Sequence, residues 1–145
     1  QIPLPPDIPF CSSNKETVRK HLGLKSGKKY ILWGTSQPQC ERKGKKLFDE
    51  CLDILWKNLD ETSRQQIVIV NVGPPAGRFG INSNFSAIYF GYQETRKKMS
   101  IFYRACDISV CTTTSDAGPM MISESMCNET PVIAFDRSVS LDLCE

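Results

Sequence analysis

The sequence predicts an α/β protein with a doubly wound, mostly parallel sheet of the Rossmann-like kind. Short apolar runs alternate with helix-length segments about five times along the chain, which is the pattern of repeated strand–helix–strand units. Residues 66–72 (QIVIVNV) are apolar with little alternation, as expected of a parallel strand covered on both faces. A chain of 145 residues has the size of one domain and can bury a proper core.

The first half of the chain begins with an extended segment, because four prolines interrupt residues 2–10 and prevent a helix there. A helix is expected from Ser13 to Leu22, capped by Ser13 and closed by Gly23. His21 is expected on its surface. Residues 29–33 form the first strand, which Gly34 ends. The next helix presents one apolar face, made of Leu47, Phe48, Cys51, Leu52, Leu55 and Trp56.

The second half continues the alternation after strand 66–72. Residues 73–84 are expected to form a loop, whose glycines lack the register of a dinucleotide-binding fingerprint, so an NAD-dependent enzyme is excluded. A short strand at 87–90 precedes a helix at 95–106 and a strand at 108–112. A further helix then leads to Thr130-Pro131, which opens the last apolar run, residues 131–135.

Composition and charge exclude several classes of protein. The 40% hydrophobic and 23% charged residues are typical of a globular chain, and no apolar run approaches the roughly 20 residues of a transmembrane helix. The net charge of +2 does not indicate a nucleic-acid partner. The basic clusters at 42–46 and 96–98 are interpreted as solvated helix faces, with Lys43 as the exception.

Cysteine usage favours a reducing, cytoplasmic location. There are seven cysteines, and no pair has zinc-ligand spacing, so no metal site is expected. Four of them fall at positions that predict burial: Cys51, Cys106, Cys111 and Cys127. The chain begins with Gln1 rather than Met, and we expect it to be an excised piece of a longer protein.

Two carboxylates mark the candidate site. Asp116 lies in the loop at the carboxyl end of strand 108–112, where ligands bind in open α/β sheets, and Glu124 follows on the next helix. Between them Gly118 lets the backbone approach a ligand, and the first helical N–H groups can meet an anion. The structural alternative is that Asp116 caps the helix and Glu124 pairs with a lysine.

The run from Asp116 to Ala134 resembles the donor-binding signature of the retaining GT-B glycosyltransferases of family 4. That signature is Glu, seven residues, Glu, a helix of small residues and Gly-Thr-Pro-Val. Here Asp116 replaces the first Glu, and Asn128-Glu129 stand where Cys-Gly is usual, whereas Thr130-Pro131-Val132 match. The resemblance implies that residues 13–145 are the donor-binding half of a GT-B fold, truncated at its C-terminus, and that residues 1–12 are the interdomain linker.

The resemblance also implies roles for individual residues. Lys43-Gly44 matches a Lys-Gly pair that holds the diphosphate in the family, but Thr35 follows Gly34 where the family has an arginine. Thr35, Ser36 or Arg42 would then take part of that role. The implied catalytic residues are Asp116, Glu124 and Lys43, with Asp116 on the sugar hydroxyls and Glu124 on the ribose. The further implied donor-binding residues are Gly91, Tyr92 and Gln93 around the base, and Gly34, Gly118, Pro119, Met120 and Met121 at the diphosphate. The alternative for Tyr92 is a loop aromatic without a ligand.

The implied activity is transfer of a sugar from a nucleotide-diphosphate sugar, expected to be a UDP-sugar, to a glycan or glycolipid acceptor. No metal or other cofactor is expected. The acceptor would lie in a missing N-terminal domain of the same polypeptide, so this chain alone is expected to be inactive. Polysaccharide biosynthesis, peripheral to the inner face of the cell membrane, is a further expectation.

Two other interpretations stay open. A GT-B sugar-nucleotide epimerase would need catalytic acids and histidines that this chain lacks. A non-catalytic nucleotide-binding module, derived from a GT-B enzyme, is favoured by the departures at Thr35, Asn128-Glu129 and Ser138.

Overall fold

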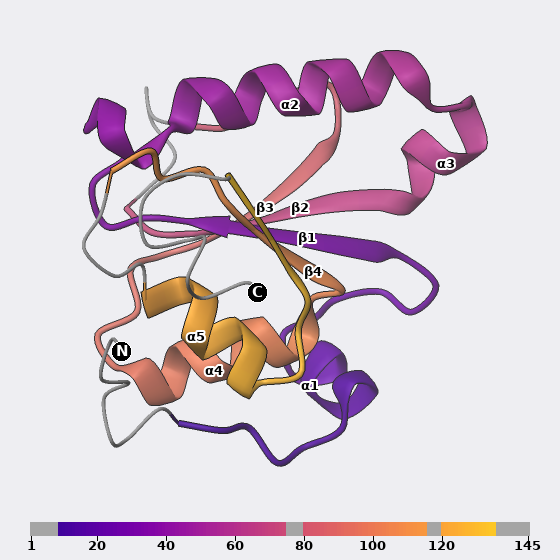
Figure 1. Ribbon diagram of the computed structural model, residues 1–145. Coiled ribbons are helices and arrows are strands. Elements are labelled where there is room, and N and C mark those ends of the chain that lie inside the picture. The colour runs from indigo at the N-terminus through magenta and orange to yellow at the C-terminus, as the bar shows by residue number, and fades with distance from the viewer. Residues whose placement is uncertain (1–8, 75–79, 116–119, 136–145) are drawn as a thin grey trace.

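The computed structural model describes residues 9–74, 80–115 and 120–135 of the chain (Figure 1). Their strands form one five-stranded sheet in the order β3-β2-β1-β4-β5, and every pair of neighbours is parallel. The strands are β1 (Lys29–Gly34), β2 (Ile67–Val72), β3 (Ser86–Phe90), β4 (Ile108–Cys111) and β5 (Val132–Ala134). The predicted α/β class and parallel sheet are therefore confirmed.

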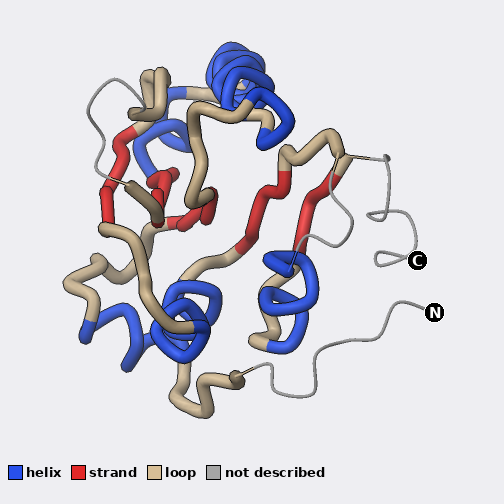
Figure 2. Tube along the Cα trace, turned by 90° about the vertical axis from the view of Figure 1, so that its left-hand side faces the viewer, coloured by secondary structure: helices blue, strands red, loops and turns tan. Residues whose placement is uncertain are grey.

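Helices cover both faces of this sheet, as Figures 1 and 2 show from two directions. One face carries α2 (Lys45–Asn58) and α3 (Glu61–Gln66), and the other carries α1 (Lys15–His21), α4 (Arg96–Ala105) and α5 (Met120–Cys127). A short 3-10 turn, Glu41–Lys43, precedes α2. None of the helices in the described ranges has the length and apolar character needed to cross a bilayer.

Alternating strand residues supply the two halves of the core. Tyr30 and Leu32 of β1 pack in the cluster that includes Phe102 of α4. Trp33 points to the other face, where its ring stacks on Phe48 of α2 with centroids 5.1 Å apart. This period of two is the geometry of a strand, and it explains why β1 is apolar on both faces from Tyr30 to Trp33.

Polar side chains cap the starts of α1 and α3. The prediction placed the first cap one residue too early and missed the second helix. Asn14, rather than Ser13, caps α1, because its side chain accepts from the Thr17 N–H at 2.8 Å. Asp60 caps α3 by accepting from the Ser63 N–H at 2.9 Å, and this hydrogen bond is the main reason that the pKa of Asp60 is lowered. The sequence ETSRQQ of α3 has no apolar period, so only the cap could have indicated it.

The prediction that four cysteines are buried is wrong for two of them. Cys106 and Cys111 are buried as predicted, whereas Cys51 and Cys127 are exposed. The buried residues of α2 are Phe48 and Leu52 alone, so the buried stripe is narrower than its apolar pattern and leaves Cys51 outside. Burial raises the pKa of the Cys106 thiol to about 12, which keeps it protonated and unreactive.

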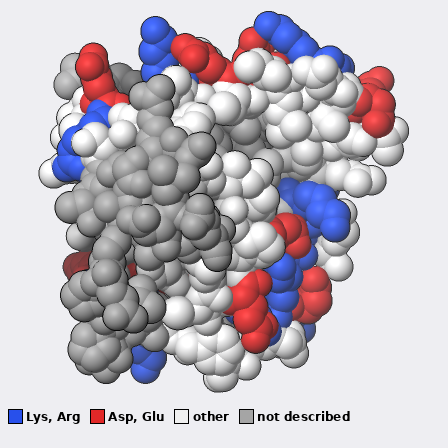
Figure 3. Space-filling view, in the orientation of Figure 1, with Lys and Arg blue, Asp and Glu red and all other residues white. Residues whose placement is uncertain are grey.

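The basic clusters lie largely on solvated helix faces, as predicted. Along α2, Lys45 pairs with Asp49 and Lys46 with Glu50. Figure 3 shows acidic and basic side chains alternating along the edge of the molecule formed by this helix. The Lys46–Glu50 pair is exposed and contributes little stability, whereas Lys45 and Asp49 are partly buried. The two pairs leave no continuous basic stripe on this edge.

Glu129 occupies the position at which the resembled family has glycine. Its φ is 58°, and it ends α5 by donating its N–H to the Met126 carbonyl at 3.0 Å. A left-handed residue after a helix is usually glycine, because a side chain there is strained. The strain at Glu129 is partly offset by the ion pair that its side chain forms with Arg104.

We expect Glu129→Gly to raise the free energy of unfolding by roughly 0.5–1 kcal/mol, since the relief of left-handed strain exceeds the value of an exposed ion pair. Urea denaturation measures this change. The control, Glu129→Gln, removes the charge but keeps the Cβ, and should leave stability equal or slightly lower. A glycine variant no more stable than the wild type would contradict the strain argument.

Candidate functional site

The candidate site lies at the carboxyl ends of β1 and β4, where the strand order reverses. From β1 the chain proceeds to β2 and β3 on one side, and β4 and β5 lie on the other. The loops that leave β1 and β4 therefore diverge to opposite faces and leave a crevice between them. The start of α5 lies at the same edge of the sheet (Figure 1).

Hydrogen bonds join the loop after β1 to the loop after β4. The Thr114 N–H donates to the Arg42 carbonyl at 2.9 Å, and the Thr112 hydroxyl donates to the Lys43 carbonyl at 3.0 Å. The Thr112 hydroxyl in turn accepts from the indole N–H of the buried Trp33 at 3.0 Å. The backbone around Lys43 is thus held to the end of β4.

Gly44 permits this contact. Its φ is 70°, and a Cβ built on it would lie 1.9 Å from the Thr112 carbonyl oxygen. No side chain fits in that space, and the left-handed conformation also favours glycine. The Lys43-Gly44 pair, identified from the sequence, therefore has a structural reason at Gly44 that is independent of any ligand.

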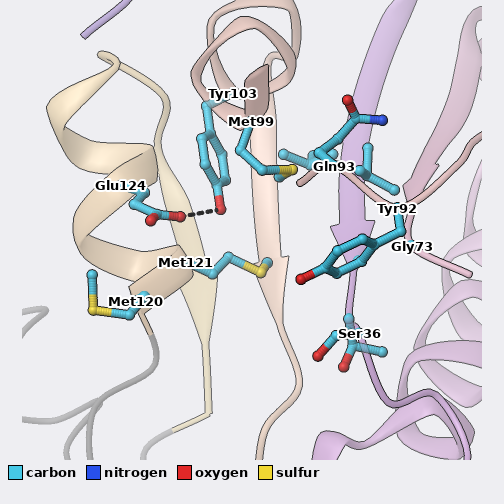
Figure 4. Close-up of a pocket in the computed structure, with 13 residues that line it drawn as sticks. Ser36, Gly73, Tyr92, Gln93, Met99, Tyr103, Met120, Met121 and Glu124 are labelled. Atoms are coloured by element: carbon cyan, nitrogen blue, oxygen red, sulfur yellow. Dashed lines mark hydrogen bonds between the residues drawn. The ribbon is translucent and has the colours of Figure 1, made fainter. Parts of the chain in front are cut away.

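Two adjacent cavities open at this crevice and share five lining residues: Gly34, Thr35, Ser36, Met120 and Met121. The larger, about 430 Å³, extends to Tyr92, Gln93 and Glu124. The smaller, about 330 Å³, extends to Lys43 and Thr112. Figure 4 shows the larger cavity, with Glu124 on one wall and Tyr92 on the other.

Most of the described residues that the sequence selected line these cavities. They are Gly34, Thr35, Ser36, Lys43, Tyr92, Gln93, Met120, Met121 and Glu124. Arg42 and Gly91 are in neither lining; the Arg42 guanidinium instead donates to the Ser115 carbonyl at 3.3 Å. Asp116, Gly118 and Pro119 lie outside the described residues. His21 is exposed on α1, as predicted.

Glu124 is the acidic group of the larger cavity and is only 8% exposed. Its Oε2 accepts from the Tyr103 hydroxyl at 2.9 Å, and its Oε1 lies 3.6 Å from Nε of Arg96. Burial raises the pKa of Glu124, against the opposing effects of the Tyr103 hydrogen bond and the Arg96 charge. A carboxylate desolvated in this way, with an opening beside it, is suited to bind a ligand hydroxyl.

The sequence did not identify Met99 and Tyr103 as site residues. Both line the larger cavity from α4. They are four residues apart, which places them on one face of a helix, but the same spacing also fits core packing. Burial raises the pKa of Tyr103 well above its ordinary value, and the Glu124 charge adds to that effect, so the hydroxyl stays protonated and donates.

Comparison of the sequence with family profiles gives the family of the chain, and comparison of the structure with solved structures gives its fold. A family profile described as Glycosyl transferases group 1 matches residues 14–144. Comparison with curated protein sequences finds no significant match. The structure resembles the C-terminal domain of a glycosyl transferase group 1 family protein (LpcC) from Francisella tularensis, at 18% identity and a TM-score of 0.60, covering 88% of this chain and 67% of that one.

Two longer proteins contain a similar domain. WaaG, a glycosyltransferase involved in lipopolysaccharide biosynthesis, matches at 20% identity and a TM-score of 0.65, over 88% of this chain and 34% of its own. A UDP-forming α,α-trehalose-phosphate synthase from Burkholderia xenovorans matches at 13% identity and a TM-score of 0.64, over 88% of this chain and 36% of its own. Identities this low indicate a shared fold, and the chain spans about a third of either protein.

Proposed function

Because the chain belongs to the group 1 glycosyl transferases, we propose that it binds the nucleotide-diphosphate sugar, a UDP-sugar, for a transferase that retains the anomeric configuration. The observation that carries this proposal is the convergence of Glu124 and Lys43 on adjacent cavities at the switch point of the sheet. One end of the crevice is suited to hydroxyls and the other to phosphate.

Glu124 is proposed to accept hydrogen bonds from the ribose hydroxyls. A carboxylate is an acceptor at both oxygens, and Glu124 lines the cavity on the α5 side. The base would lie toward Tyr92 and Gln93. Tyr92 is 62% exposed, yet its ring faces the cavity in Figure 4, so it offers an aromatic surface to a planar ligand.

The diphosphate is proposed to lie toward Lys43, near the start of α5. Lys43 lines the cavity that Met120 and Met121 also line, and a helix N-terminus adds a positive dipole end. A cationic side chain and a helix dipole can stabilise the charge that develops on a leaving diphosphate, without a metal ion. Asp116 is proposed to bind the sugar hydroxyls.

The acceptor is proposed to be a glycan or a glycolipid bound by a further domain. Closure of two domains on the donor would then complete the catalytic site, and this chain alone would bind donor without transferring sugar. Turnover by the purified chain would contradict that part. A non-catalytic nucleotide-binding module is the second candidate, favoured by Thr35 in the place of the family's arginine.

The test is calorimetry of UDP, GDP and ADP with the wild type and Glu124→Gln. We expect UDP to bind most tightly, and the variant to lose about 1–3 kcal/mol of UDP binding free energy, because a charged acceptor of two hydroxyls becomes a neutral amide. Glu50→Gln is the matched control: it removes a carboxylate from the exposed face of α2 and should bind UDP normally.

Two results would contradict this proposal. Unchanged UDP affinity in Glu124→Gln would remove the ribose assignment. Equal losses in both variants would show a general effect of net charge rather than a contact with the ligand.

A further inference from the structure

We propose that Tyr103 is a positioning residue, which holds the Glu124 carboxylate in the orientation that receives the ribose of the donor. This inference rests on the proposed function and adds a residue that neither the sequence pattern nor the comparisons identify. It stands on the contact between α4 and α5 across the wall of the larger cavity (Figure 4).

The contact is direct and buried. Tyr103 is 3% exposed, and its hydroxyl donates to Glu124 Oε2 at 2.9 Å, between residues 21 apart in the chain. Both residues line the larger cavity. A glutamate side chain has several rotamers that must be restricted before it can bind a ligand in one geometry, and this hydrogen bond restricts them.

The two carboxylate oxygens of Glu124 have different environments. Oε2 receives the Tyr103 hydrogen bond, whereas Oε1 lies 3.6 Å from Arg96 Nε, which is longer than a good hydrogen bond. The Arg96 side chain is 49% exposed, so water screens its charge. Oε1 is therefore the oxygen with more remaining capacity to accept hydrogen bonds. By holding Oε2, Tyr103 fixes the direction in which Oε1 faces.

Tyr103 is itself rigid. Its ring belongs to the buried cluster beneath the sheet, with Leu32 and Phe102. Its backbone carbonyl accepts from the buried Thr130 hydroxyl at 2.6 Å, at the loop before β5. A positioning group needs this kind of support, because a mobile donor would not fix its acceptor.

The Tyr103 hydrogen bond also favours the ionised form of Glu124. Burial raises the pKa of Glu124, and the Tyr103 hydrogen bond and the Arg96 charge, both from α4, oppose that rise. Among the described residues, the Cys111 thiol of β4 also contributes to the raised pKa of Tyr103. Without the hydroxyl the pKa of Glu124 rises further. As the pH is lowered, the Glu124 carboxylate is then protonated at a higher pH than in the wild type. Ribose binding is lost at that higher pH as well.

The experiment is UDP calorimetry from about pH 5.5 to about pH 8.5 with the wild type and Tyr103→Phe. We expect affinity to fall by roughly threefold to tenfold at the upper end of this range. The loss should grow as the pH decreases, because the midpoint of the variant is shifted upward. Tyr30→Phe is the matched control: Tyr30 is also buried, and its hydroxyl donates to the Lys25 carbonyl at 2.9 Å, away from the cavity.

A second measurement separates this inference from the proposed function. The side-chain carboxyl 13C shift of Glu124, assigned with Glu124→Gln, is titrated in the unliganded protein, and its midpoint should move up in Tyr103→Phe but not in Tyr30→Phe. An unmoved midpoint, or a loss of affinity that is the same at every pH, overturns the role of Tyr103. Failure of the wild type to bind UDP overturns the proposed donor site, and the carboxyl titration still decides whether Tyr103 controls Glu124.

Discussion

Gly44→Ala is expected to lower the free energy of unfolding by roughly 2–4 kcal/mol, because it combines left-handed strain with a steric overlap. The added methyl would lie 1.9 Å from the Thr112 carbonyl oxygen, so the loop after β1 must move away from β4. The hydrogen bond between Thr112 and the Lys43 carbonyl would be disturbed as well. Urea denaturation measures the stability, and UDP calorimetry on the folded variant measures the effect on the crevice.

Gly23→Ala separates the two contributions. Gly23 has the same φ of 70°, but a Cβ there meets nothing within 4 Å. Its substitution should therefore cost only the strain, about 1 kcal/mol, and leave UDP binding unchanged. If the two variants lose equal stability, the close approach to Thr112 has no energetic consequence.

Asn128→Ala is expected to lower the free energy of unfolding by about 2–4 kcal/mol. Asn128 is fully buried, and its side chain accepts from the Cys11 N–H at 2.8 Å and donates to the Pro9 and Glu124 carbonyls at 3.1 and 2.8 Å. The variant leaves the partly buried Cys11 N–H and two carbonyls without these partners, and each such loss is costly. Thermal or urea unfolding measures the change.

A matched bond exists on the surface. Asn58 donates its side-chain amide to the Ile54 carbonyl, four residues earlier, at 2.8 Å on the exposed side of α2. This is the same bond that Asn128 makes to Glu124, without the burial and without the contacts to residues 9–11. Asn58→Ala should change stability by no more than about 0.5 kcal/mol. A comparable loss in both variants would show that the connection to residues 9–11 is not what Asn128 stabilises.

Asn128 also explains a departure from the resembled family. The sequence shows Asn128-Glu129 where Cys-Gly is usual, and this was one reason to consider a non-catalytic module. The structure gives the asparagine a structural role, because it connects residues 9–11 to the end of α5. The glutamate keeps the left-handed backbone that glycine would adopt. Neither residue lines the crevice, so these two departures carry little weight against a donor site.

The parallel sheet could be predicted because strand and helix signals are local. A buried parallel strand must be apolar on both faces, so β1 and β2 are visible as apolar runs. Local signals failed where a helix has no apolar period, or where an exposed residue has the same spacing as the buried ones. The helix α3 has no apolar period, and Cys51 follows the spacing of α2 but lies beside its buried stripe.

The candidate site was predictable for a related reason. In a parallel sheet the loops after the strands meet at one edge, so Lys43 and Glu124 could be assigned to the same edge from their positions along the chain. The contact between Tyr103 and Glu124 could not. It joins two helices through side chains whose relative rotation depends on packing, and each residue alone fits an ordinary helix.

The sequence by itself determined the order of elements apart from α3, the parallel sheet and the edge at which its polar residues gather, because these follow from periodicity and from the chemistry of the loops. Only the tertiary structure decided that Gly44 contacts Thr112, that Asn128 holds residues 9–11, and that Tyr103 donates to Glu124. Each of these contacts joins residues distant in the chain, and its geometry depends on how the helices pack on the sheet rather than on any local pattern.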